Sequence, residues 1–231
     1  MGKRIIQQAR GKGSLTYRVR KKAFKYKIGY PKSEGEAQIV KLIHSPAHSA
    51  PLMKLKIGKE TFYLPAFNLA FVEQKITVGK DAKVGNILKL KDIPAGTQIY
   101  NIERNPGDGG KMMRVAGSSA IVAKKLENEK VIVTMPNKRV LTLHGNCRAT
   151  LGIIAGEGRK LKPFMTAGKK YHKMKAKSKP WPRVSAVAVN AVDHPFGSGR
   201  GKRIKSKIAQ RNASPGQKVG HLRPRRTGHK R

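Results

Sequence analysis

Residues 53–64 read Met-Lys-Leu-Lys-Ile-Gly-Lys-Glu-Thr-Phe-Tyr-Leu. Apolar and charged residues alternate with a period of two over 53–57, the pattern of a half-buried β-strand. Gly58-Lys59-Glu60 then predicts a turn into a second strand over 61–64. These residues therefore predict a β-hairpin, and they set the fold class that we expect for the centre of the chain.

Short strands of the same kind are predicted around this hairpin. Glycines and a proline (Gly79, Gly85 and Pro94) punctuate the region, and it has almost no helical periodicity. Strands this short, separated by turns, are typical of a small barrel such as an OB-fold. The further strands predicted in this first set lie at 38–44, 67–72, 76–78 and 86–90.

A second set of strands follows from Gly96. Turns are predicted at 107–110 (Gly-Asp-Gly-Gly) and 136–138 (Pro-Asn-Lys), and the first does not match a phosphate-binding loop because no Lys-Ser/Thr pair follows it. The run 118–129 contains good helix formers, yet we expect a strand and a turn there. About six strands in about sixty residues match the size of an SH3-like barrel. They are predicted at 97–102, 112–116, 120–123, 131–135, 140–143 and 151–154.

We therefore predict a mainly β protein, with an OB-fold-like barrel followed by an SH3-like barrel and extended basic arms at both ends. The junction between the barrels is expected at 91–94. Since each barrel is small, packing against the other barrel or against RNA is expected to contribute to stability. The predicted segments are a basic N-terminal arm at 1–35, the OB-like barrel at 36–92, the SH3-like barrel at 93–158 and a basic C-terminal extension at 159–231.

The charge is extreme and uneven. The chain has 51 basic and 12 acidic residues among 231, a net charge of +39. Residues 1–35 carry +10, residues 36–158 only +8, and residues 159–231 carry +21. Repulsion on this scale favours a polyanionic partner, and nucleic acid is the obvious one. Arms of this composition cannot bury enough apolar surface to order themselves alone, so we expect them to order on a large RNA.

A membrane partner is not expected. No apolar run reaches the roughly 18 residues that a spanning helix needs, and the N-terminal residues contain no hydrophobic signal. The single cysteine, Cys147, allows no internal disulfide and fits a reducing compartment. The sequence thus predicts a cytosolic protein that binds a polyanion.

Side-chain patterns that could support catalysis or metal binding are weak. His44 and His48 have the spacing of a helical zinc pair, but Pro46 lies between them and no third ligand is evident. His144 and Cys147 are more often structural than catalytic at such a spacing, because no partner thiol or base accompanies them. The few acidic residues are too scattered for paired acid–base work. We therefore predict neither an enzyme nor a metal centre.

The C-terminal extension contains an unusual passage from apolar to glycine-rich sequence. A basic run at 169–179 has too little hydrophobic periodicity to pack on its own, and Pro180-Trp181-Pro182 predicts an extended path. Small apolar residues follow at 184–192, then Asp193-His194-Pro195, which is typical of a turn. The glycines of 197–201 would let backbone N–H groups face phosphates.

Residues 180–203 resemble the signature of a universal family, the second protein of the large ribosomal subunit. The resemblance is closest to its archaeal or eukaryotic branch, because Phe196 and Ser198 stand where bacterial members usually have a second histidine and a glycine. It extends over nearly the whole chain, with two arms and two barrels. The matching groups are Arg183-Val184, Ala188-Val189-Asn190, Val192-Asp193-His194-Pro195 and Gly197-Ser198-Gly199-Arg200.

The resemblance implies a structural constituent of the large subunit in the cytoplasmic ribosome. It implies binding to large-subunit rRNA near the peptidyl-transferase region, contacts with neighbouring ribosomal proteins and the small-subunit interface, and support of subunit association and tRNA binding. No cofactor is expected beyond Mg²⁺ ions shared with rRNA. His194 could in principle transfer protons, but we favour a role in contacting RNA, because no base or nucleophile accompanies it.

The candidate RNA-binding residues lie in the two arms. Aromatic side chains interleaved with cations can stack on bases while the cations hold phosphates. For Tyr17, Phe24, Tyr26 and Tyr30, packing on the edge of the folded domain is the alternative. The candidates are Arg10, Lys12, Tyr17, Arg18, Arg20, Lys169, Lys170, Lys173, Lys179, Trp181, Arg183, Asn190, His194, Gly197, Gly199, Arg200, Lys202, Arg203, Arg223, Arg225 and Arg226.

Two other function classes remain open from the residues alone. A DNA-compacting protein fits the charge, although no groove-binding helix is evident. An RNA-modifying enzyme could use His194 with Asp193 or Cys147, although no cofactor-binding motif supports it.

Overall fold

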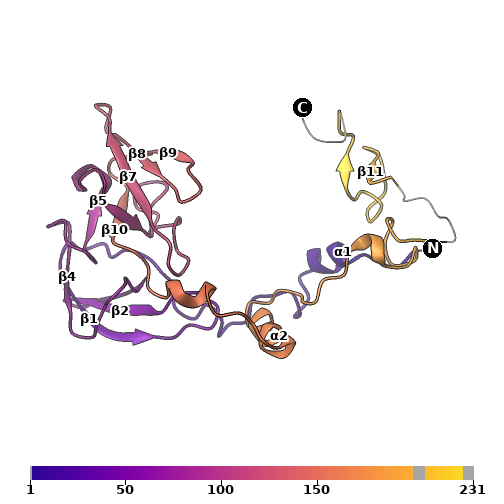
Figure 1. The fold of residues 1–231 in the computed structure, drawn as a ribbon, viewed down its shortest axis with the longest axis horizontal. Helices are drawn as coiled ribbons and strands as arrows, with labels where there is room; N and C mark the ends of the chain where they lie inside the picture. Colours follow the sequence, from indigo (N-terminus) through magenta and orange to yellow (C-terminus); the bar gives the residue numbers. More distant parts are fainter. Residues whose placement is uncertain (1, 200–205, 226–231) are drawn as a thin grey trace. The chain divides into compact units, whose positions relative to one another are not determined.

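The computed structural model describes residues 2–199 and 206–225 and divides into two compact units (Figure 1). Arg20–Met165 form one, here called the central unit. Met1–Val19 and Thr166–Arg231 form the other, here called the terminal unit. The two ends of the sequence therefore fold together in one unit, and the β-rich middle forms the other.

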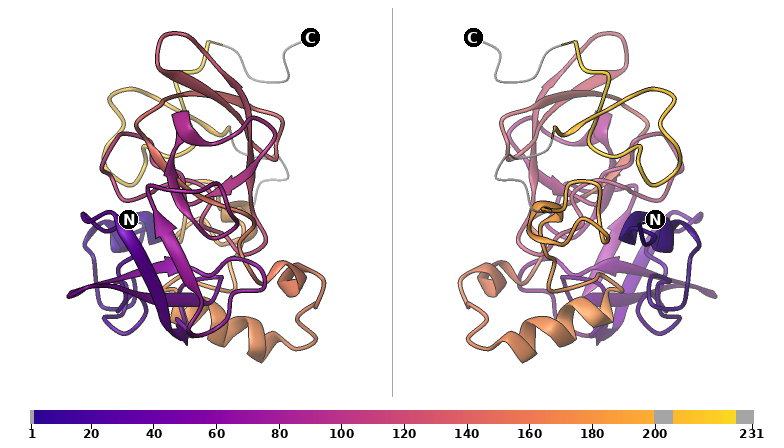
Figure 2. Two further views of the ribbon diagram at one scale, coloured as in Figure 1. Left: turned by 90° about the vertical axis from the view of Figure 1, so that its left-hand side faces the viewer. Right: turned by 90° about the vertical axis from the view of Figure 1, so that its right-hand side faces the viewer.

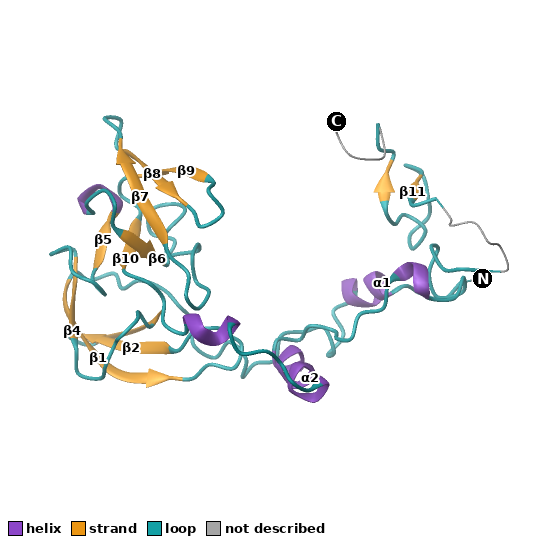
Figure 3. Ribbon diagram, in the orientation of Figure 1, coloured by secondary structure: helices purple, strands orange, loops and turns teal. Residues whose placement is uncertain are grey.

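The described strands of the central unit, which are orange in Figure 3, form a ten-stranded sheet. Their order in the sheet is β3-β2-β1-β4-β5-β10-β6-β7-β8-β9. All neighbours pair antiparallel except β4 and β5, which are parallel. The mainly β prediction is confirmed. The strands are β1 (Gly35–Ile43), β2 (Leu52–Ile57), β3 (Glu60–Pro65), β4 (Lys75–Val78), β5 (Ile87–Lys89), β6 (Gln98–Tyr100), β7 (Ala120–Lys125), β8 (Lys130–Thr134), β9 (Val140–His144) and β10 (Arg148–Leu151).

The hairpin predicted at 53–64 is the β2–β3 pair. Leu55 lies opposite Phe62 and Met53 opposite Leu64, and all four side chains are buried. The intervening Lys54 and Lys56 remain more exposed, as the period-two pattern requires. This strand pair therefore forms one wall of an apolar core.

The central unit has two apolar clusters (Figure 2 shows its strands from two further sides). The first draws mainly on β1–β4 and the second mainly on β6–β10. Neighbouring residues of β5 divide between them, because successive side chains of a strand point to opposite faces. Ile87 belongs to the first cluster and Leu88 to the second. Two cores accord with a barrel-rich fold, while the domain boundary at 92/93 stays a prediction.

Two predicted strands were wrong. Residues 67–72 form turns, apart from one isolated bridge between Phe67 and Ile154. Phe67 is buried, but Leu69, Phe71 and Val72 are exposed, and Leu69 has a positive φ of 67°. Residues 112–116 likewise make only a bridge from Met112 to Ile102, and the next residue turns with φ 53°. Apolar composition alone did not distinguish turns from strands here.

The last predicted strand, at 151–154, was displaced along the sequence. The strand is β10 at Arg148–Leu151, and it ends before Gly152, whose φ of 112° lies in a region that side chains disfavour. By contrast, the run 118–129 contains β7 and a turn, and no helix, as predicted. Short 3₁₀ turns at Leu90–Asp92 and Glu157–Lys160 complete this unit.

The described part of the terminal unit has short elements and little core. They are α1 (Ile6–Gly11), α2 (Ala167–Ala176), a 3₁₀ turn (Ala186–Ala188), and the paired β11 (Ile208–Ala209) and β12 (His221–Leu222). Helix α2 was not predicted, because its sequence lacks an apolar stripe, and none of its residues is buried. The abundant Lys, Ala and Met of this run have high helix propensity, which accounts for the helix. Among the described residues of this unit, the buried apolar side chains are Ile5, Ala209 and Val219.

No helix within residues 2–199 and 206–225 has the length and apolar composition needed to cross a bilayer.

Candidate nucleic-acid interface

A closed loop at 189–198 lies at the centre of the interface residues predicted from the sequence. Asn190 and Ser198 form a parallel bridge. The Ala191 amide donates to the Ser198 carbonyl (3.2 Å), and the Ser198 amide donates to the Val189 carbonyl (3.1 Å). These bonds fix the two ends of the loop side by side, so the residues between them turn back sharply.

Backbone contacts inside the loop explain one of its glycines. The Asn190 carbonyl accepts hydrogen bonds from the amides of Asp193 (3.0 Å) and His194 (3.3 Å), and the His194 carbonyl accepts one from Gly197 (2.8 Å). A Cβ atom at Gly197 would strike the Asn190 carbonyl, so no side chain fits there. Gly197 thus serves the loop's own packing, and its amide is already bonded. Gly199 faces open space, which leaves its backbone accessible to a ligand.

The imidazole of His194 is held by its own loop. Its Nδ1 accepts a hydrogen bond from the Phe196 amide (3.0 Å), and the two rings meet edge to face with centroids 5.0 Å apart. In the neutral ring the proton therefore sits on Nε2, which acts as a donor. Asp193 forms its ion pair with Lys3 (3.3 Å) and so does not orient the histidine as a catalytic carboxylate would.

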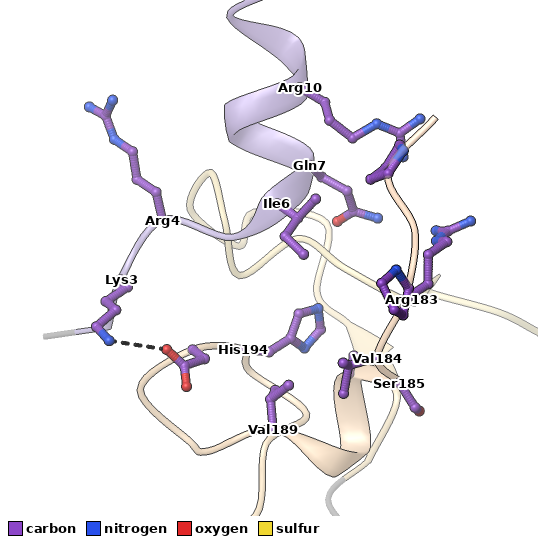
Figure 4. A pocket seen from close by; sticks show the side chains of 14 residues that line it. Lys3, Arg4, Ile6, Gln7, Arg10, Arg183, Val184, Ser185, Val189 and His194 are labelled. Atoms are coloured by element: carbon purple, nitrogen blue, oxygen red, sulfur yellow. Dashed lines mark ion pairs between the residues drawn. The ribbon is translucent and has the colours of Figure 1, made fainter. Parts of the chain in front are cut away.

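A pocket of about 820 Å³ brings together residues from the two ends of the chain (Figure 4). Arg10, Arg183 and His194, all predicted from the sequence, line it. Lys3 and Arg4 line it as well, and these were missed. They stand about 190 positions from His194 in sequence, and only the fold of the terminal unit joins them. In the sequence, only their place in the basic N-terminal arm indicated that these two residues could bind RNA.

The other predicted residues of the terminal unit are dispersed over α2 and the flanking loops. Lys170 places its Nζ 5.2 Å from the ring centroid of Trp181, a cation–π contact that occupies part of the indole. Tyr17 and Asn190 lie outside the pocket, half-buried and exposed respectively. Lys173 is half-buried on α2, whereas Lys169 on the same helix is exposed. The remaining exposed cations are Lys12, Arg18, Lys179, Arg223 and Arg225, while Arg200, Lys202, Arg203 and Arg226 lie outside the described residues.

The aromatic residues of the N-terminal arm divide between packing and exposure. Tyr30 is structural, because its hydroxyl donates to the Asn101 carbonyl (2.7 Å) and lies 2.9 Å from Thr150 Oγ1. Burial raises the pKa of this phenol. Phe24 packs edge to face on His48. Packing on the edge of the domain, the alternative interpretation, therefore holds for these two. The exposed Arg20 begins the central unit.

A surface pair of tyrosines in the central unit was not predicted as such. The rings of Tyr26 and Tyr63 lie 4.9 Å apart, and Lys25 Nζ lies 5.8 Å from the Tyr26 centroid. A pair of aromatic rings beside a cation can also accept a base. Tyr63 carried no signal in the sequence, since in an alternating strand it is indistinguishable from a packing residue.

A buried polar network holds the end of the N-terminal arm on the central unit. The fully buried carboxylate of Glu103 accepts from the amides of Gly107 (3.2 Å), Gly109 (3.0 Å) and Arg148 (2.8 Å), and its Oε1 lies 3.2 Å from Arg148 Nη2. Arg148 Nη1 in turn donates to the Pro31 carbonyl (2.7 Å). These bonds fix the path of the chain and occupy both oxygens of the Glu103 carboxylate.

The remaining candidates for chemistry are occupied structurally. His48 Nδ1 lies 2.7 Å from Ser45 Oγ. Cys147 is buried in the second core, and burial raises the pKa of its thiol to about 11, so it is a poor nucleophile at neutral pH. Within the described residues, no three His, Cys, Asp or Glu side chains gather to hold a metal ion.

Comparison with known proteins identifies the family. The family described as ribosomal proteins L2, C-terminal domain, matches residues 83–216. The protein named large ribosomal subunit protein uL2 of Archaeoglobus fulgidus is 46% identical over 239 residues, covering all of both chains. The proteins of the same name from Methanococcoides burtonii and Methanococcus vannielii are 44% and 43% identical to this chain, and each match covers at least 99% of both chains. The chain belongs to this family.

Membership of the ribosomal protein L2 family confirms the resemblance inferred from residues 180–203, including its archaeal character. The match at 83–216 takes in the second core of the central unit, α2 and the loop at 189–198. The relatives are named as ribosomal proteins and not as enzymes, in agreement with the geometry around His194. The terminal unit is therefore the part of the molecule whose ligand needs to be explained.

Proposed function

We propose that this protein is a structural constituent of the large ribosomal subunit and that its terminal unit binds the rRNA of that subunit. Family membership supports the assignment to the subunit. The charge of the terminal unit supports RNA as its ligand: 24 Lys and Arg against the single acid Asp193. With three buried apolar side chains among its described residues, this unit has little core to oppose the repulsion.

Neutralisation of phosphates would supply most of the affinity. Each cation that contacts a phosphate releases condensed counterions, so binding weakens steeply as salt is added. The central unit carries 27 basic and 11 acidic residues and has its own core. It would dock on folded RNA by shape and by contacts to 2′-hydroxyl groups. The two units thus contribute different kinds of recognition.

The finer placement follows from the resemblance of the loop at 189–198 to the family signature. We propose that this loop lies near the peptidyl-transferase region and that the protein supports subunit association and tRNA binding. Neighbouring ribosomal proteins and the small-subunit interface are its other proposed partners. We expect no resident cofactor, and Mg²⁺ ions would be shared with rRNA phosphates. His194 would contact RNA through Nε2, since its Nδ1 is already bonded.

Sedimentation of a cell lysate tests this function. At low salt the protein is expected to sediment with large-subunit particles, and at high salt to leave them. Recovery on DNA, or in the soluble fraction at low salt, would contradict the proposal. A variant lacking residues 193–201 is expected to keep the fold of the central unit while subunit assembly or function fails. Unfolding of the central unit in that variant would mean that the loop is part of its core.

A further inference from the structure

The pocket between α1 and the segment 180–194 has the dimensions of a ligand site. Its volume of about 820 Å³ falls within the range of small-molecule pockets, about 300–1,000 Å³. All of its lining residues belong to the terminal unit. The pocket is therefore large enough to hold a single group of the RNA, which a flat surface could not do.

The apolar wall of the pocket is formed by side chains of both α1 and the opposite segment, and it is open to solvent. Ile6 is 64% exposed and Val184 is 68% exposed, and both line the space together with Pro182 (Figure 4). When a flat, weakly hydrated group covers exposed apolar side chains in a concave site, the free energy falls because apolar surface is removed from water. A nucleobase is such a group.

The rim of the pocket is cationic. Arg4, Arg10 and Arg183 line it, each exposed. Within the described part of the chain none of these guanidinium groups forms an ion pair, because the nearby Asp193 carboxylate is taken by Lys3. Planar guanidinium groups bind phosphate in a bidentate manner. The rim therefore suits the phosphates on either side of a base held in the pocket.

The inner end of the pocket offers hydrogen-bonding groups. The ring of His194 and the amide of Gln7 point into the space between α1 and the opposite segment (Figure 4). His194 can donate from Nε2, since Nδ1 accepts the Phe196 amide. Gln7 can both donate and accept. These groups match the polar edge of a base that is not paired with another.

We propose that this pocket binds one unstacked nucleotide of RNA, with the base against Ile6 and Val184 and its flanking phosphates at Arg4, Arg10 and Arg183. The inference rests on the proposed RNA-binding function and adds to it a preference for a single-stranded or bulged position. A paired and stacked base cannot enter a pocket, so duplex RNA would use the rim alone. The other charged ligand that the rim could attract is an acidic peptide, which lacks a flat group for the apolar wall.

Fluorescence of a modified base tests the proposal directly. The full chain is mixed with a 12-nucleotide single-stranded RNA that contains one 2-aminopurine, whose emission is quenched by stacking on neighbouring bases. Binding is expected to raise the emission several-fold, because an aliphatic wall replaces the stacked neighbours. A duplex of the same sequence is expected to bind without that rise.

Two matched variants separate the pocket from the general charge. Ile6→Ser combined with Val184→Ser removes the apolar wall and keeps every cation. This double variant is expected to bind single-stranded RNA about tenfold more weakly, as loss of one base contact does. It is also expected to show no rise in fluorescence. Duplex binding should stay unchanged. Leu15→Ser with Val19→Ser, at residues of the same unit that are 86% and 55% exposed and lie outside the pocket, should bind both RNAs as the unaltered chain does. Val184→Ser alone, at an exposed position outside any helix or strand, keeps the test valid if the Ile6 substitution disturbs α1.

The proposal is overturned if binding of the single-stranded RNA gives no rise in emission. It is also overturned if the control variant at Leu15 and Val19 loses as much affinity as the variant at Ile6 and Val184. The same holds if polyglutamate at equal charge concentration displaces the single-stranded RNA from the unaltered chain but not from the variant with Ile6→Ser and Val184→Ser. That result would assign the pocket to an acidic peptide. These outcomes differ from failure of the proposed function, in which the protein would not sediment with large-subunit particles at all.

Discussion

The central and terminal units differ in how far buried side chains stabilise them. The central unit buries two apolar clusters and a fully buried carboxylate within its sheet. The described part of the terminal unit buries three apolar side chains and has one ion pair, Lys3–Asp193, whose side chains are 72% and 39% exposed. An exposed pair of this kind contributes about 0–1 kcal/mol. One chain thus combines a unit stabilised by its own core with a unit whose charge is matched to a partner.

This difference shows what the cations of each unit do. In the central unit, Arg148 and Arg114 turn inward and bond to the carbonyls of Pro31 and Ile28. Partial burial lowers the pKa of the Arg114 guanidinium. In the terminal unit, Arg4, Arg10 and Arg183 line an open pocket. Cations of the first kind stabilise the fold, whereas cations of the second kind are available to phosphates.

Removal of the buried carboxylate should have the largest effect. Glu103→Ala leaves three backbone amides and the largely buried Arg148 without their acceptor. We expect it to lower the free energy of unfolding of the central unit by about 3–5 kcal/mol. Denaturant titration followed by far-ultraviolet circular dichroism measures this loss. The control is Glu36→Ala, whose surface pair with Lys75 should contribute less than about 1 kcal/mol. Equal losses in the two variants would mean that the network does not hold the unit together.

Truncation of a core side chain should come next and should separate the units. Leu55→Ala leaves a cavity in the first core and is expected to cost about 2–5 kcal/mol. Ile5→Ala, at a buried residue of the terminal unit, should leave the unfolding of the central unit unchanged. Because Trp181 is the sole tryptophan, its fluorescence reports the terminal unit separately from circular dichroism. If Ile5→Ala shifted the central transition, the two units would be one cooperative structure.

The buried thiol should produce a dependence on pH in the central unit alone. Burial raises the pKa of Cys147 to about 11 from a reference value of 9.0. A raised pKa means that its contribution to stability is present below pH 9 and is lost as the pH rises to about 11. This rise in the pKa corresponds to about 2–3 kcal/mol of stability. Denaturant titrations at pH 8 and pH 11 should therefore show the unaltered chain losing that much more stability than Cys147→Ala. Equal losses in the two proteins would contradict the assignment.

Removal of one pocket cation should have the smallest effect, on RNA binding and not on folding. Arg183→Gln should reduce the slope of log affinity against log salt by about 1, as expected for one phosphate contact. Its unfolding transition should not move, since the side chain is exposed. The comparison variant is Lys59→Gln, at an exposed turn of the central unit, and we expect it to change the slope less. A larger change at Lys59 would place the main phosphate contacts on the central unit.

Local patterns predicted much of the central unit from the sequence. The period-two alternation at 53–57 predicted β2 and its partner, because one face of that hairpin is buried and the other exposed. The strand predicted from the apolar residues of 67–72 was wrong, because the segment forms turns in which Leu69, Phe71 and Val72 are exposed. Both segments contain several large apolar residues, and burial, which depends on distant residues, separates them.

The pocket shows why the candidate site was predicted only in part. Arg183 and His194 stood out because they lie in the family signature, and Arg10 because it lies in a Gly-Arg-rich arm. Ile6, Gln7 and Arg4 gained their significance when α1 was placed against the segment 180–194. That placement depends on contacts such as the Lys3 amide with the Val192 carbonyl (2.8 Å). No local pattern in either segment indicates such a contact.

Hydrogen exchange of the full chain, with and without large-subunit rRNA, tests the contrast between the units most directly. In the free protein, amides of β2 and β8 are expected to exchange slowly, as in a stable core, and amides of α1, α2 and the loop at 189–198 to exchange fast. Addition of rRNA is expected to slow exchange throughout these parts of the terminal unit. Slow exchange of α2 and the loop in the free protein, or no protection of them by rRNA, would contradict the account.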